Sequence, residues 1–146
     1  MKPIIDQLVI KRFRSFPNEV ATFANPTFLV GRNGAGKSNF VDIFSFVSEA
    51  MVSPLQAVFD RRGGISAVRN RSSRRSYPPN MRIGIKLGEL NGNISKASFA
   101  FEVKTLPNYL FEIVREQYTV IQKEGQRYWH ERKGVKFASN VEGLAP

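Results

Sequence analysis

The sequence predicts an α/β fold, and three observations support this prediction. An apolar run at residues 27–30 leads into a glycine-rich loop, and apolar residues at helical spacing follow that loop. Beyond residue 80, long segments alternate apolar and polar residues between turn signals, which is typical of antiparallel strands. A chain of 146 residues, 42% hydrophobic and 12% aromatic, can bury one core. We therefore expect a central strand, loop and helix joined to an antiparallel β subdomain, as one domain or part of a larger one.

Turn signals at residues 17–18 and 25–26 divide the first thirty residues into three expected strands, at 4–13, 19–24 and 27–30. The third of these has a different character from the others. Phe28, Leu29 and Val30 form a continuous apolar run, as in strands that are covered on both faces. We therefore expect this strand to be central in its sheet.

A helix is expected after the glycine loop. Its apolar residues recur at intervals of three and four positions up to about residue 52, namely at Phe40, Ile43, Phe44, Val47 and Met51. Ser53 and Pro54 suit the start of a second helix, because serine caps helices and proline fits their first position. This short helix, at 54–60, is expected to end at the glycines at 63 and 64.

The remaining chain divides by composition. Residues 61–88 contain eight basic residues and no acidic residue, with Arg69, Arg71, Arg74 and Arg75 close together. Four strands of an antiparallel meander are expected after this segment, at 81–90, 94–105, 109–121 and 125–133. The predicted organisation is a core at 1–60, a basic arginine-rich loop at 61–80, a meander of the same lobe at 81–137 and a tail without periodicity at 138–146.

Charge and composition limit the function classes. The formal net charge is +10 and the isoelectric point is near 10.3, which favours anionic partners such as nucleotides, DNA, RNA or an acidic protein surface. The chain contains no cysteine and a single histidine, His130, so it offers neither disulfides nor a thiolate metal site. It shows no signal peptide and no membrane-spanning run. We expect a cytoplasmic protein with no membrane partner.

The loop GRNGAGKS satisfies the phosphate-binding pattern G-x-x-x-x-G-K-[ST] at Gly31, Gly36, Lys37 and Ser38. Glycines allow consecutive backbone N–H groups to converge on phosphate oxygens, and the following helix points its positive end at the same place. The pattern predicts ATP binding, with Lys37 reaching the β and γ phosphates and Ser38 binding Mg²⁺. The alternative is a glycine-rich turn before a core helix, with an exposed lysine.

Two further features extend the match. Asn33 and Gly34 lie inside the loop, and Arg12-Phe13-Arg14-Ser15 precedes it. With these residues, the first 52 positions resemble the amino-terminal lobe of RecF and SMC type ATPases, a branch of the ABC-type P-loop fold that includes bacterial DNA-repair and phage-defence ATPases. Arg12 stands where that family commonly has asparagine.

The resemblance implies a set of nucleotide-binding residues. These are the loop residues Gly31, Arg32, Asn33, Gly34, Ala35, Gly36, Lys37, Ser38 and Asn39, together with Arg14 and Ser15. It also implies Mg²⁺ as the cofactor of ATP, and a homodimer or larger ATPase assembly. On its own, an arginine in the turn after a strand is more often a solvated charge, so both interpretations of Arg14 remain open.

Hydrolysis requires additional groups that this sequence does not display. In the family it resembles, these are an apolar run ending in Asp-Glu, a glutamine in a loop, and a signature motif on the opposing subunit. The chain is therefore expected to be an incomplete lobe. It is expected to bind ATP by itself, and to act as an ATPase only when further elements complete it.

Three functions are compatible with the sequence. The first is an ATP-binding lobe that couples nucleotide binding to action on nucleic acid, in DNA repair or anti-phage defence. The second is a non-catalytic, basic nucleic-acid-binding module whose loop grips a backbone phosphate. The third is a small-molecule kinase, which the two strands before the loop disfavour. The arginine-rich loop either contacts nucleic acid, through Arg69, Arg71, Arg74 and Arg75, or is a solvated or protein-docking segment.

Overall fold

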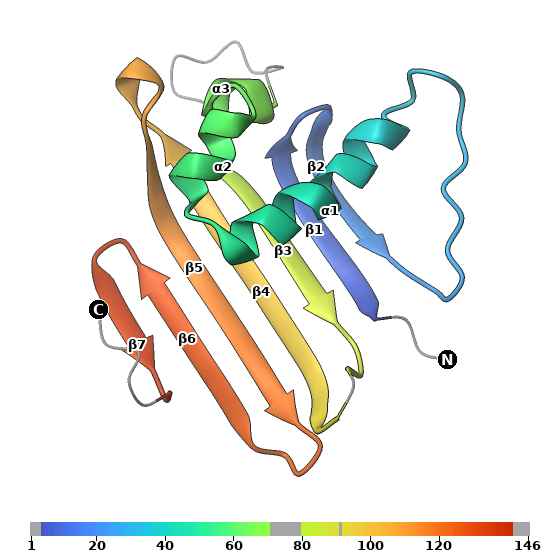
Figure 1. The fold of residues 1–146 in the computed structure, drawn as a ribbon, viewed down its shortest axis with the longest axis vertical. Helices are drawn as coiled ribbons and strands as arrows, with labels where there is room; N and C mark the ends of the chain where they lie inside the picture. Colours follow the sequence, from blue (N-terminus) through green and yellow to red (C-terminus); the bar gives the residue numbers. More distant parts are fainter. Residues whose placement is uncertain (1–3, 71–79, 91, 142–146) are drawn as a thin grey trace.

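The computed structural model describes residues 4–70, 80–90 and 92–141, which form one antiparallel sheet with helices on one face (Figure 1). The seven strands follow the order β2-β1-β3-β4-β5-β6-β7. The strands are β1 (Ile5–Phe13), β2 (Phe16–Thr22), β3 (Met81–Leu87), β4 (Ile94–Thr105), β5 (Phe111–Gln122), β6 (Arg127–Lys133) and β7 (Lys136–Ser139). The helices are α1 (Lys37–Val52), α2 (Leu55–Arg61) and α3 (Ile65–Val68), and a 3-10 turn, η1 (Pro107–Tyr109), joins β4 to β5.

The first hairpin turns earlier than the sequence predicts. Phe13 pairs with Phe16, so Arg14 and Ser15 form the turn, and Pro17 and Asn18 lie inside β2. The predicted turn at Pro17-Asn18 is therefore wrong. Proline is tolerated there because β2 is an edge strand, whose outer side has no ladder hydrogen bonds to lose.

The expected central strand at residues 27–30 is also wrong. These residues belong to the irregular connection between β2 and α1, which extends away from the sheet in Figure 1. Phe28 is 81% exposed and Val30 is 86% exposed. An apolar run becomes a central strand only when strands pair on both of its sides, and the described residues place no strand next to it.

The core lies between the sheet and the helices. Alternate strand residues such as Leu8, Ile10 and Ile83 are buried, and they face Ile43 and Phe46 of α1. The Phe46 ring lies 5.5 to 6.0 Å from the rings of three other core residues, Phe13, Phe59 and Phe101. Burial of this apolar surface is the main stabilising contribution, and it holds α1 against the sheet.

The remaining elements agree in part with the sequence predictions. β4 spans the residues expected, and α1 begins three residues before the expected first apolar position. β7 was not expected, because a four-residue edge strand is too short to show periodicity; the hairpin turn before it contains Gly134, at φ 56°. α3 lies within the segment predicted as a basic loop. Arg71, Arg74 and Arg75 fall outside the described residues, as do residues 142–146 of the tail.

Candidate nucleotide-binding site

The glycine loop makes a tight turn directly before α1. Gly34 and Gly36 have φ angles of 80° and 88°, in the left-handed region that side chains disfavour. The Ala35 amide donates to the Arg32 carbonyl at 3.1 Å, and the Phe40 amide donates to the Gly36 carbonyl at 2.9 Å. The second bond begins the regular hydrogen bonding of α1, so the loop backbone lies at the positive, N-terminal end of this 16-residue helix.

A cavity of about 330 Å³ lies at this helix end. Its lining consists of loop and first-turn residues, namely Asn33, Gly34, Gly36, Lys37, Ser38 and Asn39. Backbone N–H groups, an ammonium, an amide and a hydroxyl are the donor types that bind phosphate oxygens, and the hydroxyl oxygen is also a ligand that Mg²⁺ accepts. The residues present therefore fit a nucleotide phosphate with its metal ion.

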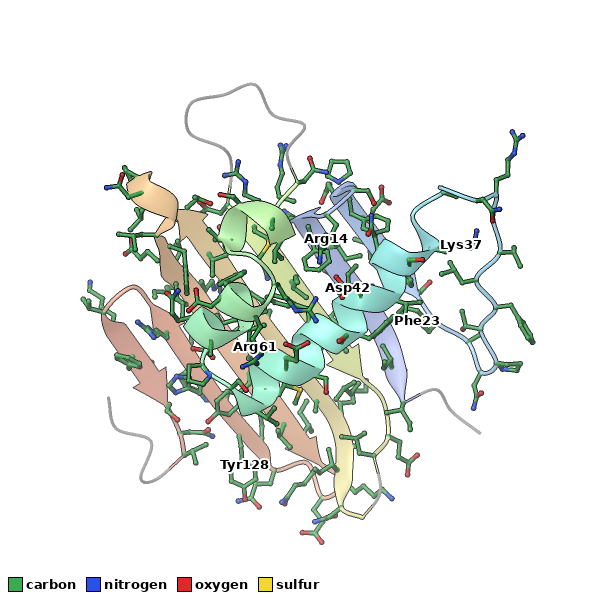
Figure 2. All side chains as sticks on the ribbon, turned by 45° about the horizontal axis from the view of Figure 1, so that its top comes forward. Arg14, Phe23, Lys37, Asp42, Arg61 and Tyr128 are labelled. Carbon is green, nitrogen blue, oxygen red and sulfur yellow. The ribbon has the colours of Figure 1, made fainter. Side chains whose placement is uncertain are left out.

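The Lys37 ammonium is held by the loop itself. Its Nζ donates to the Gly31 carbonyl at 2.6 Å and to the Arg32 carbonyl at 2.7 Å. These two bonds close the loop around the lysine side chain, whose residue also lines the cavity. Figure 2 labels Lys37 at the start of α1. A phosphate group would have to compete with these two carbonyl oxygens for the ammonium.

The turn of the first hairpin approaches this loop through Ser15. The Asn39 side-chain amide donates to the Ser15 hydroxyl at 3.0 Å. A Cβ atom at Gly36 would lie 3.2 Å from the same hydroxyl oxygen, which is closer than most such contacts. The fold thus brings Ser15 next to the glycine loop, as the family resemblance implies.

The Arg14 guanidinium takes a different direction. Its Nε and one terminal nitrogen contact Asp42 Oδ2 at 3.2 and 3.1 Å, and its other terminal nitrogen donates to the Ala67 carbonyl at 3.2 Å. Asp42 lies on α1, more than one helical turn beyond Lys37 (Figure 2). Arg14 therefore links the hairpin turn to α1 and α3, while its neighbour Ser15 meets the loop.

A second arginine, Arg62, binds both Asp42 and Glu49, and it was not among the site residues predicted from the sequence. Arg62 contacts Asp42 Oδ1 at 2.7 Å and Glu49 Oε1 at 2.5 Å, with its side chain only 10% exposed. Its guanidinium also lies 5.3 Å from the centre of the Phe46 ring. Asp42 and Glu49 are seven positions apart, which places them on one side of α1, and this spacing was the available sequence signal.

This arginine also determines the acidity of its partner. The hydrogen bond from Arg62 lowers the pKa of Glu49, and its effect outweighs the opposing effect of burial. Burial by itself would lower the pKa of Arg62, but the hydrogen bonds to Glu49 and Asp42 raise it. Both groups are consequently held in their charged forms.

Arg69 is the one member of the predicted arginine cluster that the structure describes. It is half-buried, and it donates to the Thr105 hydroxyl at 3.2 Å. Burial lowers its pKa, and the nearby charge of Arg12 adds to that effect.

The described residues contain no group of three or more His, Cys, Asp or Glu that could hold a metal ion. No helix among them is long and apolar enough to cross a membrane.

A protein-family model matches residues 27–137, which include the glycine loop, α1 and the sheet from β3 to β6. Its description is "AAA domain, putative AbiEii toxin, Type IV TA system". The chain belongs to this AAA domain family. It is an α/β lobe of an AAA-type P-loop ATPase, which confirms the α/β fold class and the P-loop ATPase resemblance predicted from the sequence.

One solved structure is similar to this AAA domain chain. It comes from work on ATP-driven dimerization and DNA-stimulated activation of SMC ATPases. The two chains are 20% identical, with a TM-score of 0.49, and the match covers 93% of this chain and 72% of the other. No curated protein matches the sequence.

Proposed function

We propose that this chain is the ATP-binding lobe of an ATPase that couples nucleotide binding to action on nucleic acid, in DNA repair or anti-phage defence. The observation that carries the proposal is the cavity at the N-terminus of α1, which combines left-handed glycines with the Lys37 ammonium. Membership of an AAA domain family supports nucleotide binding, and the net charge of +10 supports a nucleic-acid partner.

Each residue of the loop has a distinct role in this proposal. The backbone from Gly31 to Gly36 surrounds the phosphates, and Ser38 at the start of α1 binds Mg²⁺. Lys37 exchanges the carbonyls of Gly31 and Arg32 for the β and γ phosphate oxygens. This exchange is favourable because a charged acceptor makes a stronger hydrogen bond than a neutral carbonyl.

ATP turnover by this lobe depends on elements from another segment or subunit. Residues 28–30 are apolar and exposed beside the loop, so they offer a strand for pairing. We propose that a completing segment or a second subunit pairs there and supplies the carboxylate and the water-positioning group that hydrolysis needs. A homodimer formed around the nucleotide satisfies this requirement. Arg14 is adjacent in sequence to Ser15, which contacts the loop through Asn39, and we propose that Arg14 contacts the nucleotide after leaving Asp42.

The test is the affinity of the purified chain for a fluorescent ATP analogue with Mg²⁺. Lys37→Ala is expected to abolish binding, because it removes the cation that contacts two phosphates. Lys123→Ala is the matched control, since Lys123 is exposed and pairs with Glu89 in a distant turn. Thermal unfolding of both variants should remain close to that of the parent chain. Unchanged affinity in the Lys37 variant would contradict the proposal.

A second candidate is favoured by the same net charge of +10. In it, the loop grips a backbone phosphate of nucleic acid, and the chain has no use for ATP. Lys37→Ala would then weaken binding of an oligonucleotide, and added ATP would leave that binding unchanged. Nucleotide affinity in the micromolar range or tighter, together with DNA binding that is independent of Lys37, would exclude this candidate.

A further inference from the structure

The face of the sheet opposite the helices is strongly basic. Register identifies its residues, because paired positions on neighbouring strands point to the same side and Leu8 and Ile10 point to the helices. Nine basic residues belong to this open face: Lys11, Arg82, Lys86, Lys96, Lys104, Arg115, Arg127, Lys133 and Lys136. The four acidic residues on it are Asp6, Glu102, Glu112 and Glu131.

Six of these residues form one row across the sheet. The row passes through consecutive register partners from β1 to β7, in the order Lys11, Arg82, Glu102, Arg115, Lys133 and Lys136. Neighbouring strands are about 4.8 Å apart, so the row is roughly 24 Å long. Each strand of a DNA duplex carries one phosphate per about 3.4 Å, so a row of this length can face several phosphates.

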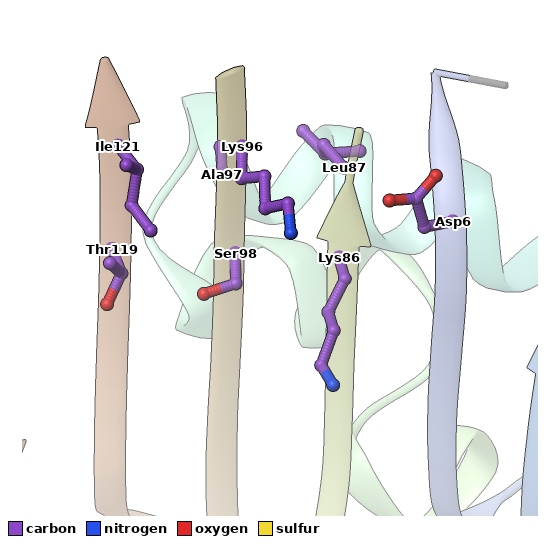
Figure 3. Close-up of a pocket in the computed structure, with 8 residues that line it drawn as sticks. All are labelled: Asp6, Lys86, Leu87, Lys96, Ala97, Ser98, Thr119 and Ile121. Carbon is purple, nitrogen blue, oxygen red and sulfur yellow. The ribbon is translucent and has the colours of Figure 1, made fainter. Parts of the chain in front are cut away.

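A second group of donors lies beside this row, in a cavity of about 230 Å³ (Figure 3). Lys86 pairs in register with Ser98, and Ser98 pairs with Thr119. Figure 3 shows Lys86, Lys96, Ser98 and Thr119 projecting from three adjacent strands, with the helices behind the sheet. Two ammonium groups and two hydroxyls match the oxygens of a phosphodiester, and one carboxylate, Asp6, lies at the side.

The positive charges of this face are largely uncommitted. Among the described residues, seven of its nine cations form no ion pair, and Arg115 and Lys133 share the carboxylate of Glu131 on the same face. On the helix side, Arg14 and Arg62 are neutralised by Asp42 and Glu49. Nine basic and four acidic residues give the open face a net charge of +5, half of the formal net charge of +10 of the chain.

We infer that the open face of the sheet binds the phosphate backbone of nucleic acid, without sequence preference. Phosphate contacts from lysines fix position but do not read bases, and a sheet face presents no helix to a groove. A membrane is the poorer match, because β1, β3, β4, β5 and β6 carry no exposed large hydrophobic residue and surface helices bind membranes through such residues. The inference names the contact surface for the nucleic-acid partner in the proposed function, and it shares no residue with the nucleotide cavity.

The test measures binding of a fluorescein-labelled DNA duplex of mixed sequence to the purified chain by anisotropy, without nucleotide. Salt is varied from about 50 to 200 mM, a range over which phosphate contacts lose most of their strength. The double variant Lys86→Gln/Lys96→Gln removes two charges from the open face. It is expected to bind more weakly and to lower the slope of log K against log salt by about 2, or 1 for each lysine.

The matched control is Arg61→Gln/Lys123→Gln, which removes two exposed charges from outside the open face. It should leave the salt slope unchanged. Equal loss in the two double variants would overturn the inference, since it would show that net charge alone attracts DNA. Absence of DNA binding by the parent chain would overturn the inference too. So would displacement of the labelled DNA by polyaspartate or by phosphatidylserine vesicles as effectively as by unlabelled DNA of the same total charge.

The two proposals fail separately in these measurements. Lys37→Ala should lose the ATP analogue and keep its DNA affinity, because Lys37 is not on the open face. If DNA binding is found and ATP binding is not, the nucleotide proposal is wrong and the open face stands. If ATP binding is found and DNA binding is not, the open-face inference is wrong and the nucleotide proposal stands.

Discussion

Gly36 shows how strongly one residue is constrained in this site. Its φ of 88° lies in the left-handed region, and a Cβ atom there would lie 3.2 Å from Ser15 Oγ and 3.7 Å from the Phe16 ring. Two independent requirements, on conformation and on space, therefore apply at the same position. Only glycine meets both, and meeting them lets the hairpin turn and the glycine loop approach each other at the start of α1.

Gly36→Ala is expected to destabilise the chain by about 2 kcal/mol, of which about 1 kcal/mol is the cost of the left-handed conformation. Gly125→Ala is the matched control, because Gly125 has the same φ of 88° and open space around its would-be Cβ. The control should lose only the conformational part. Urea denaturation measures the free energy of unfolding of each variant. Equal losses of stability in the two variants would show that Ser15 and Phe16 do not restrict position 36.

At the scale of elements, a chain of ion pairs connects the first hairpin to the helices. Arg14 of the hairpin turn binds Asp42 on α1, Asp42 also binds Arg62 after α2, and Arg62 binds Glu49 on α1. Arg62 is the central member, with two carboxylates and the Phe46 ring around it. The apolar core holds α1 on the sheet, and this polar cluster attaches the β1–β2 turn and the turn after α2 to α1.

Arg62→Met should destabilise the chain by about 2–3 kcal/mol, because it leaves two partly buried carboxylates without their main cation. Arg61→Met should cost less than about 0.5 kcal/mol, since Arg61 is 52% exposed and forms only one long contact, to Glu49. The free energy of unfolding in urea distinguishes the two variants. Similar losses would indicate that the Arg62 cluster is no stronger than a surface ion pair.

At the scale of the whole molecule, two exposed surfaces are available for binding. One is the uncovered basic face of the sheet. The other is the apolar segment at residues 28–30, which is exposed directly before the glycine loop. Large exposed apolar groups next to a binding site are typical of interaction surfaces. Assembly with further protein is therefore expected to involve the surface beside the nucleotide site.

Phe28→Ser/Val30→Ser is expected to reduce self-association at high protein concentration, as measured by sedimentation velocity. Its effect on the free energy of unfolding should stay below about 0.5 kcal/mol, since both side chains are more than 80% exposed. Val52→Ser/Val135→Ser is the control, because these valines are equally exposed elsewhere. A loss of more than about 1 kcal/mol would show that residues 28–30 are packed in the folded chain.

Local patterns in the sequence were sufficient for most elements and for the glycine loop. The spacing of Phe40, Ile43 and Phe44 predicts α1, and the alternation at 94–105 predicts β4, because each pattern depends only on neighbouring residues. The loop was predictable for the same reason, since its glycines, Lys37 and Ser38 are adjacent in the chain. Membership of the AAA domain family agrees with that prediction.

The tertiary structure decided what depends on distant partners. Residues 28–30 have the composition of a central strand and yet are exposed, because strand formation requires neighbours that the described fold does not provide. The direction of Arg14 toward Asp42, and the role of Arg62, arise from contacts between residues 13 to 28 positions apart. The basic row from Lys11 to Lys136 exists only through sheet register, which brings together side chains separated by up to 125 positions. Sequence thus determined the local chemistry, and long-range packing determined where that chemistry is displayed.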